Sequence, residues 1–370
     1  MARPISLLLI PTGTEDDAPP EIYLDAGGVW RTLGEMSLLP QKLPQARASF
    51  GKVLGELSEV LDANPANADD NSIRAEGTDL FQKLVPSEIQ QVLRKALDQS
   101  AGADAPVLRI HAVQRYDWIP WELLYDDDRQ HFLGLRFAIA RMPIVPNPPE
   151  MPDGQPRKIT AIANFLGANV YPPGDPMLNT WHNTFAGLTN GAVVNIRPNM
   201  AGADWPRIPA VGESLKADVL HITCHGMRLG GEFFLNLAPN DPIPAMKGLG
   251  PKQINAFLRT SNRPLVFGNA CNPPGGLPDK PRLEPSGLGK AFFTKGALNI
   301  VSTLSPVSSR MALDFARKFY ETLFAADQPS IGQAMLRTKR HFEQLAAAGA
   351  NDPTYLFYSL YGPPETSFTH

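Results

Sequence analysis

The chain has 370 residues, of which 43% are hydrophobic and 19% are charged, and its formal net charge is −3. This is the composition of a globular protein, long enough for one large domain or two ordinary ones. No basic block stands out, so nucleic acid is not an implied partner, and no apolar run approaches the length of a membrane span. The 2 cysteines are too few for a disulfide framework. We therefore expect a protein of the reducing cytoplasm.

The first 145 residues predict a mixture of strands and helices. Strand-like runs cover Ile5 to Ile10 and Glu21 to Leu24, and a third covers Val107 to Val113. Helical spacing of apolar residues runs from Leu43 to Leu61, and Pro86 is placed to begin another helix. This part is expected to form an N-terminal α+β accessory region over residues 1–145.

Proline is frequent from Val145 to Pro156, which predicts a linker over residues 146–157. Strands and helices then alternate, and this pattern favours an α/β domain at 158–370 with a mostly parallel sheet flanked by helices. The predicted strands are Ile159 to Phe165, Ala192 to Ile196, Val219 to Cys224, Leu265 to Phe267 and Leu298 to Leu304. The predicted helices are Ser286 to Lys295, Met311 to Phe324 and a last one from Ser330 to about Ala348.

Two of these strands lead into residues with reactive side chains. His225 and Gly226 follow the buried run Val219 to Cys224, and Cys271 follows Leu265 to Phe267 after three small or polar residues. Ligands of open α/β sheets bind at the carboxyl ends of strands. The two residues are separated by enough chain for one crossover between neighbouring parallel strands, so we expect both to face one crevice.

A histidine beside a cysteine is suited to nucleophilic catalysis. A thiol needs a base to form thiolate near neutral pH, and imidazole is the usual one. The backbone N–H groups of Gly226 and Cys271 are candidates to bind an oxyanion. Caspases have the same chain order, with the histidine about 50 residues before the cysteine, although their Gln-Ala-Cys signature is absent because Asn269 stands in place of the glutamine.

The same segment also permits a metal interpretation, through His221, Cys224 and His225. On a helix the two histidines would be neighbours. On a strand they share a face but lie about 13 Å apart, while Cys224 belongs to the opposite face. The β-rich sequence favours the strand, so we expect no metal site, with His221 and Asn269 in supporting roles and Cys224 in the core. The cysteine chemistry itself requires no cofactor, so none is expected.

Several segments together resemble those of the CHAT domain, a caspase-fold peptidase group that is related to separases and often found beside TPR repeats. The resemblance covers roughly residues 78–370 and includes the 78–145 part of the accessory region. The segments that carry it are Leu220 to Gly226, Asn269 to Cys271, Gly287 to Ala297, Phe319-Tyr320, Tyr355 to Pro363, Ile119 to Leu124 and Phe132 to Pro143. Val301 to Val307 departs from the family pattern in lacking a tryptophan.

The resemblance implies a caspase-like cysteine endopeptidase that cleaves protein substrates, with His225 as the base and Cys271 as the nucleophile. It also implies that an activating or recruiting protein partner, or processing of the chain, can be needed before the site assembles, and it suggests a role in prokaryotic defence or stress. Two alternatives remain open at this point: a catalytically silent CHAT-like scaffold or sensor, and a self-cleaving regulator cut within Asn272 to Pro285.

Two further segments have simpler interpretations. Trp118 and Trp121, on either side of Pro120, are expected to be buried by packing between the two halves of the chain rather than stacked on a ligand. The acidic run Asp126 to Asp128 is expected to be a solvated turn, with divalent-cation binding as the alternative.

Overall fold

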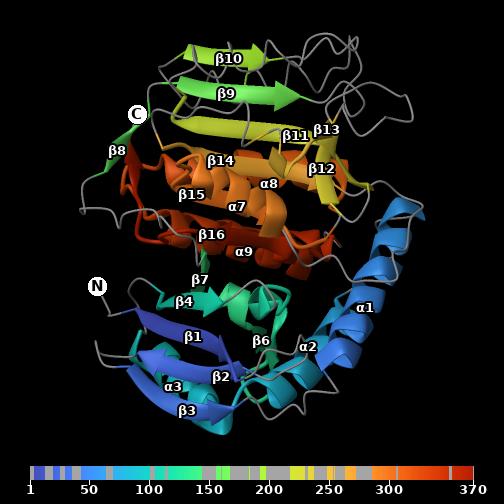
Figure 1. Cartoon of the computed structure of the whole chain (residues 1–370), viewed down its shortest axis with the longest axis vertical. Coiled ribbons are helices and arrows are strands. Elements are labelled where there is room, and N and C mark those ends of the chain that lie inside the picture. Colours follow the sequence, from blue (N-terminus) through green and yellow to red (C-terminus); the bar gives the residue numbers. More distant parts are fainter. Residues whose placement is uncertain are drawn as a thin grey trace. The chain divides into compact units, whose positions relative to one another are not determined.

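A computed structural model of the chain gives the fold (Figure 1). It describes residues 4–12, 20–25, 30–35, 43–63, 70–100, 105–112, 116–143, 156–159, 161–166, 183, 192–196, 217–229, 232–236, 248–252, 254, 263–271, 286–305, 307–349 and 352–369. Most of the predicted linker and the loop from Asn272 to Pro285 lie outside these residues.

The chain folds into two compact units, and neither is continuous in sequence. Unit 1 comprises Met1–Ile144, Pro274–Glu284 and Gly332–Leu360, and unit 2 comprises Val145–Pro273, Pro285–Ile331 and Tyr361–His370. The segment 332–360 therefore belongs with the first unit, although the chain reaches it only after most of the second.

Unit 2 is built on parallel strands in the order β10-β9-β11-β14-β15. An antiparallel extension is formed by β12, which pairs with β11, and by β13, which pairs with β12. A separate parallel pair joins β8 to β17. The bounds are β8 Arg157–Lys158, β9 Ala161–Leu166, β10 Ala192–Ile196, β11 Val219–Leu229, β12 Glu232–Asn236, β13 Gly248–Leu249, β14 Leu265–Cys271, β15 Asn299–Thr303 and β17 Phe368–Thr369.

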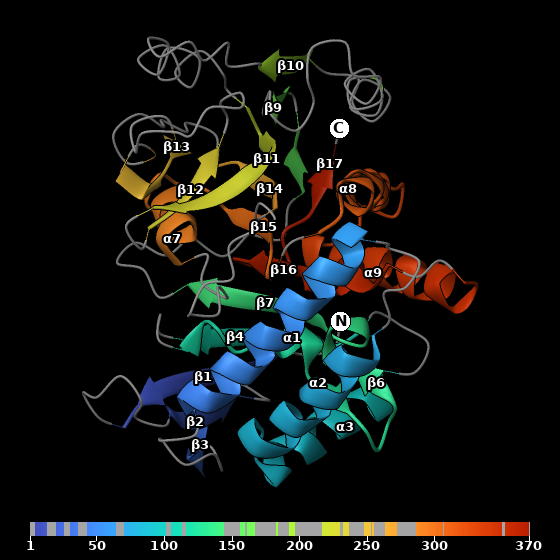
Figure 2. The ribbon, with the colours of Figure 1, turned by 90° about the vertical axis from the view of Figure 1, so that its right-hand side faces the viewer.

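Helices cover both faces of this sheet. On one face lies α8 (Ser309–Leu323), whose Phe319 and Tyr320 contact Phe267 of β14. On the other lies α7 (Ser286–Thr294), where Gly289 sits beside Ile300 of β15. The two helices are seen on opposite sides of β14 and β15 in Figure 2. The helix α8 begins at an N-cap, since the side chain of Ser308 accepts a hydrogen bond from the Met311 amide at 3.1 Å.

Unit 1 has its own mixed set of strands in the order β16-β7-β4-β1-β2-β3. The pairs β1–β4 and β4–β7 are parallel, whereas β1–β2 and β2–β3 are antiparallel. A two-stranded hairpin, β5–β6, lies apart from them. The bounds are β1 Ile5–Pro11, β2 Pro20–Asp25, β3 Trp30–Glu35, β4 Val107–Ala112, β5 Tyr125–Asp126, β6 His131–Phe132, β7 Ala138–Pro143 and β16 Tyr358–Tyr361.

The strands of unit 1 alternate between buried and half-exposed residues, as a sheet covered mainly on one side requires. Figures 1 and 2 show α3 against one side of β1, β2 and β3. The α-helices of the unit are α1 Leu43–Ala63, α2 Asn71–Leu84, α3 Ser87–Gln99 and α9 Ile331–Ala347, the last with all but its first residue in unit 1. Short 3₁₀ segments are η4 Trp121–Leu123, η5 Leu133–Leu135 and η6 Pro353–Phe357.

A buried ion pair lies at the centre of unit 1. Arg141 of β7 donates two hydrogen bonds to the carboxylate of Glu122, at 3.1 and 2.6 Å, and both side chains are 2% exposed. Ser359 of β16 donates a further one at 2.7 Å. Burial alone would raise the pKa of Glu122, but the charge and hydrogen bonds of Arg141 hold it below the ordinary value. The carboxylate thus remains ionised and ties η4 to β7 and β16.

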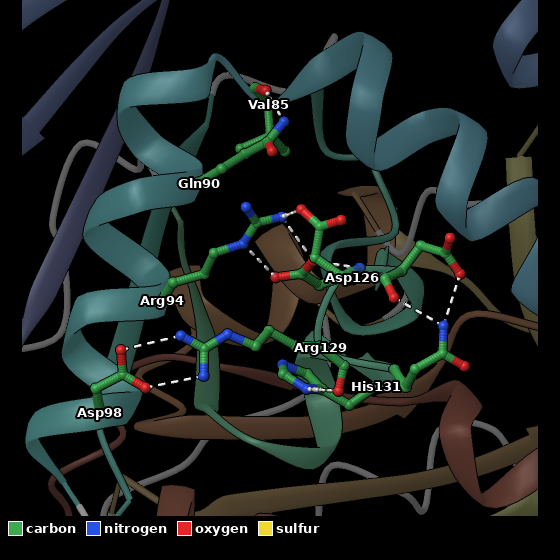
Figure 3. Close-up of polar contacts among 10 residues, drawn as sticks. Val85, Gln90, Arg94, Asp98, Asp126, Arg129 and His131 are labelled. Carbon is green, nitrogen blue, oxygen red and sulfur yellow. Dashed lines mark hydrogen bonds and ion pairs between the residues drawn. The ribbon is translucent and has the colours of Figure 1, made fainter.

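The acidic run Asp126 to Asp128 is not simply a solvated turn, and that expectation was wrong for its first residue. Asp126 is 2% exposed and accepts two hydrogen bonds from Arg94 of α3, at 2.8 and 2.7 Å (Figure 3). Asp127 and Asp128 are exposed as expected. The guanidinium neutralises the buried carboxylate and ties the β5–β6 hairpin to α3.

Other elements agree with the sequence to within a few residues, and β10 matches its predicted strand. The elements that were not predicted include α2, β3, β12, β13 and β16. Trp118 and Trp121 are buried, as expected. In the described part of the chain, every helix is either too short or too polar for a bilayer-spanning segment.

The glycine in α2 gives a first test of the packing in unit 1. Alanine normally stabilises a helix by about 0.5–1 kcal/mol relative to glycine. A Cβ on Gly77, however, would collide with the backbone oxygen of Leu123 in η4. We expect Gly77→Ala to lower the free energy of unfolding in urea by about 1–3 kcal/mol.

Gly289→Ala in α7 is the control. A Cβ there would lie 4.0 Å from its nearest neighbour, so this variant should be neutral or stabilising. Equal effects of the two changes would contradict the close approach of α2 to η4.

The buried ion pair gives a second test. Glu122→Gln keeps the shape of the side chain but removes the carboxylate charge beside the buried Arg141, whose ion pair with Asp117 is longer, at 4.0 Å. The change should cost about 3–5 kcal/mol of unfolding free energy. Glu343→Gln is the matched control: its carboxylate binds Arg136 at 3.1 and 3.2 Å with both side chains about one-third exposed, so the loss should be about 0–1 kcal/mol. Urea denaturation measures both, and similar losses in the two variants would show that the Glu122 pair is not the stronger one.

Candidate functional site

The backbone places His225 and Cys271 next to each other. Strands β11 and β14 run parallel in continuous register, from Val219 paired with Leu265 to His225 paired with Cys271. Paired residues on neighbouring strands have backbones about 4.8 Å apart and share a face of the sheet. The crossover expected between the two strands is therefore present, and the two residues occupy the last paired position between them.

The two strands do not end in the same way. Cys271 is the last residue of β14, whereas β11 continues beyond His225 to Leu229. The sequence-based expectation that β11 ends at Cys224 was therefore wrong. The reason is β12, which turns back along β11 and pairs His225 with Asn236 and Gly226 with Leu235. The parallel strand β9 pairs with β11 only as far as Thr223. From His225 onward, the antiparallel strand β12 pairs with β11 instead.

Several residues shortly before the pair are almost completely buried. His221 of β11 is 0% exposed, and its ring stacks on Phe267 of β14 with centroids 5.1 Å apart. Its two ring nitrogens lie 3.1 Å from the Tyr320 hydroxyl and 3.0 Å from the Thr223 hydroxyl. Both imidazole nitrogens are thus hydrogen-bonded inside the core.

Asn269 makes the corresponding contact on β14. It is 1% exposed, and its side-chain amide donates a hydrogen bond to the backbone oxygen of Ala312 in α8 at 2.9 Å. His221, Thr223 and Asn269 all belong to the face that α8 covers, since the register pairs His221 with Phe267 and Thr223 with Asn269. Strand alternation places residues 225 and 271 on that same face.

Burial determines the charge of His221. Removal from water lowers the pKa of the imidazole from its ordinary value to about 3, so the ring is neutral at physiological pH. The same cause raises the pKa of the Tyr320 phenol well above its ordinary value. The hydrogen-bond chain from Tyr320 to Thr223 is therefore built from neutral groups only.

Cys224 is buried on the opposite face of β11 from His221, as strand geometry predicts. Within the part of the chain that the structure describes, no group of three or more histidine, cysteine, aspartate or glutamate side chains is placed to hold a metal ion. The side chains of His225 and Cys271, and the loop 272–285, lie outside the described residues.

Sequence reasoning missed the contribution of α8. The sequence places Tyr320 in a predicted helix and among the segments that resemble the CHAT domain, and it predicts no contact for the hydroxyl, although a buried tyrosine hydroxyl needs a partner. His221 was the only histidine on the buried stretch of β11 before the pair. The combination of a core tyrosine and a core histidine is the signal that would have suggested the contact.

The mixed, mostly parallel sheet flanked by helices defines a caspase-like fold. The separase chain of the Saccharomyces cerevisiae separase–securin complex superposes with a TM-score of 0.57 at 9% sequence identity, covering 98% of this chain and 30% of that one. Gingipain R, an Arg-specific cysteine proteinase, matches with a TM-score of 0.44 at 11% identity over 90% of this chain and 77% of that one. The Porphyromonas gingivalis complex of the RgpB pro- and mature domains gives 0.44 at 9% identity, over 89% and 78%.

The family model of the CHAT domain matches residues 74–348. The chain belongs to the CHAT domain family. It spans less than a third of the separase chain that it matches, and no curated protein matches it. The family match and the caspase-like architecture both support a peptidase-type fold.

The buried histidine predicts how stability depends on pH. Unfolded His221 binds a proton below about pH 6.5, whereas folded His221, with a pKa of about 3, does not. The unfolded state thus holds more protons between these values, and stability falls as the pH is lowered through this window. From pH 7 to pH 5 this group alone should cost about 2 kcal/mol.

The measurement is the urea unfolding free energy at both pH values for the wild type and for His221→Phe, which keeps a stacked ring. The wild type should lose about 2 kcal/mol more than the variant on going to pH 5. Equal losses would show that His221 is not held neutral in the fold.

Proposed function

We propose that the protein is a cysteine endopeptidase of the CHAT, caspase-like type, with Cys271 as nucleophile and His225 as general base. The observation that carries the proposal is the register of β11 and β14, which pairs these two residues at the last shared position of two parallel strands. In open α/β sheets this is where ligands bind. The family match supports the same class of enzyme.

The proposed reaction is acyl transfer through a thioester. His225 takes the proton of the Cys271 thiol, and the thiolate attacks the carbonyl carbon of a peptide bond in a protein substrate. The backbone N–H groups of Gly226 and Cys271 bind the oxyanion of the tetrahedral intermediate. His225 returns its proton to the leaving amine as the C–N bond breaks, and a water molecule then hydrolyses the thioester. The residues of this scheme supply every proton transfer without a cofactor.

The proposal includes activation of the enzyme by a protein partner or by proteolytic processing. The separase that resembles this chain was solved as a complex with securin, a second protein. By analogy, binding of a partner, or a cut in the loop 272–285 that directly follows Cys271, would assemble the substrate groove. We place the enzyme in the cytoplasm, where a thiol nucleophile remains reduced.

Labelling with an electrophile tests the dyad. The full chain is treated with iodoacetamide at pH 7 and the modified peptides are identified by mass spectrometry. We expect rapid labelling of Cys271, and a rate at least about tenfold lower in His225→Ala, because the thiolate then lacks its imidazolium partner. Cys224, which is 1% exposed, is the internal control and should react slowly in both proteins.

Cleavage of a peptide library by the same proteins tests the function itself. Cleavage should be lost in Cys271→Ala and reduced by about 10²-fold or more in His225→Ala, as expected for the loss of a general base. Full activity of Cys271→Ala would end the cysteine-peptidase proposal. Slow labelling of Cys271 that His225→Ala leaves unchanged, together with no cleavage, would favour the silent scaffold.

A further inference from the structure

Helix α8 contacts both strands of the proposed dyad. Tyr320 reaches His221 of β11, and the backbone of Ala312, two turns earlier in the helix, accepts the hydrogen bond from Asn269 of β14. Each contact lies within four residues of the proposed catalytic residue on its strand. One helix therefore contacts both strands shortly before the proposed catalytic pair.

The contact to β11 continues toward His225 through a second hydrogen bond. His221 lies 3.0 Å from the hydroxyl of Thr223, which is the next residue on that face of the strand. Thr223 is 3% exposed, and the position after it on the same face is residue 225. The chain of hydrogen bonds thus runs from α8 along β11 and stops one face position before the proposed base.

The series of hydrogen bonds from Tyr320 to Thr223 has a fixed order of donors and acceptors at any moment. A neutral imidazole has one N–H donor and one nitrogen acceptor, so His221 donates to one of the two hydroxyls and accepts from the other. A protonated ring would have to donate to both, and burial makes that state costly, as its pKa of about 3 shows. The ring therefore does not take up a further proton near neutral pH, and it is suited to holding a position rather than to acting as a base.

We propose that Tyr320, His221 and Thr223 are positioning residues that fix the part of β11 that carries His225 relative to α8, while Asn269 does the same for β14 and Cys271. The inference rests on the proposed function, since it assigns these residues a role in that dyad. Their effect passes through the two strands, and none of them reacts with the substrate.

The mechanism of this effect is geometric. A general base must lie within hydrogen-bond reach of the proton that it removes, so a small displacement of either strand end weakens the pair. In a low-dielectric interior each hydrogen bond of the chain restrains the strand more strongly than it would in water. Loss of one bond should allow the part of β11 that carries His225 to shift without unfolding the sheet, and the thiolate of Cys271 should then be less stabilised.

The experiment is the pH profile of iodoacetamide alkylation of Cys271 in the full chain, followed by mass spectrometry of the Cys271 peptide. Tyr320→Phe and Thr223→Val each remove a hydroxyl and keep the shape of the side chain. We expect both to move the half-point of the profile to higher pH and to slow alkylation at pH 7 by about threefold to tenfold, the equivalent of one hydrogen bond. Thr223→Ser, which keeps the hydroxyl but loses the methyl group, should retain the wild-type profile.

A matched control separates positioning from stability. Thr338→Val removes another buried hydroxyl, which donates to the backbone oxygen of Ala334 at 2.8 Å in unit 1, and should leave the profile unchanged. Thermal unfolding of every variant shows whether it is folded at the temperature of the assay. A wild-type profile in folded Tyr320→Phe and Thr223→Val would overturn the inference, as would a shift in Thr223→Ser equal to that in Thr223→Val.

His225→Ala distinguishes failure of the positioning role from failure of the proposed dyad. If His225→Ala shifts the profile and the hydroxyl variants do not, the positioning role is wrong and the proposed dyad stands. If His225→Ala leaves the profile as in the wild type, the dyad itself is wrong, and the positioning role is overturned with it.

Discussion

The register between β11 and β14 is the constraint on which the candidate site depends. A slip of one residue would move His225 or Cys271 to the other face of the sheet, and a slip of two would separate them by about 6.6 Å along the strands. Two features oppose such slips. Apolar residues fill both faces of these buried strands, and the side chains of His221 and Asn269 find their partners on α8 only in the observed register. The polar contacts in the core thus specify which residues meet, in addition to any stability that they contribute.

Much of unit 2 could be predicted from the sequence because its strands are short apolar runs between helices with clear periodicity. The strand at 192–196 and the helix α8 follow from local pattern alone. The two neighbouring strands that carry His225 and Cys271 follow from the same pattern together with the usual crossover of parallel sheets. What could not be predicted depends on residues far apart in sequence. The extension of β11 to Leu229 requires β12 as a partner, and the sequence of residues 225–229 alone does not predict that pairing.

The acidic run at 126–128 shows the same limit for charged residues. Local sequence indicates an exposed turn, and this holds for Asp127 and Asp128. Asp126 is buried because Arg94, 32 residues earlier, lies opposite it and supplies a matching charge. A charge can enter the interior only with such a partner, and the partner is set by the tertiary fold. The site differs in that its described polar side chains are neutral, so their hydrogen bonds persist over a wide range of pH.

The division of the chain between the two units has a consequence for its synthesis on the ribosome. Three contacts of unit 1 join its early part to the segment 332–360 across very long stretches of chain: Gln333 with Ala105 over 228 residues, Arg136 with Glu343 over 207, and Ser359 with Glu122 over 237. Until that segment emerges, the nascent chain has buried polar groups such as the Glu122 carboxylate without their final neighbours. Synthesis proceeds at about 5–20 residues per second, so the first unit waits on the order of ten seconds or more for its last helix and strand. Such a chain exposes incompletely covered strands for that time, and unpaired strand edges of this kind favour aggregation.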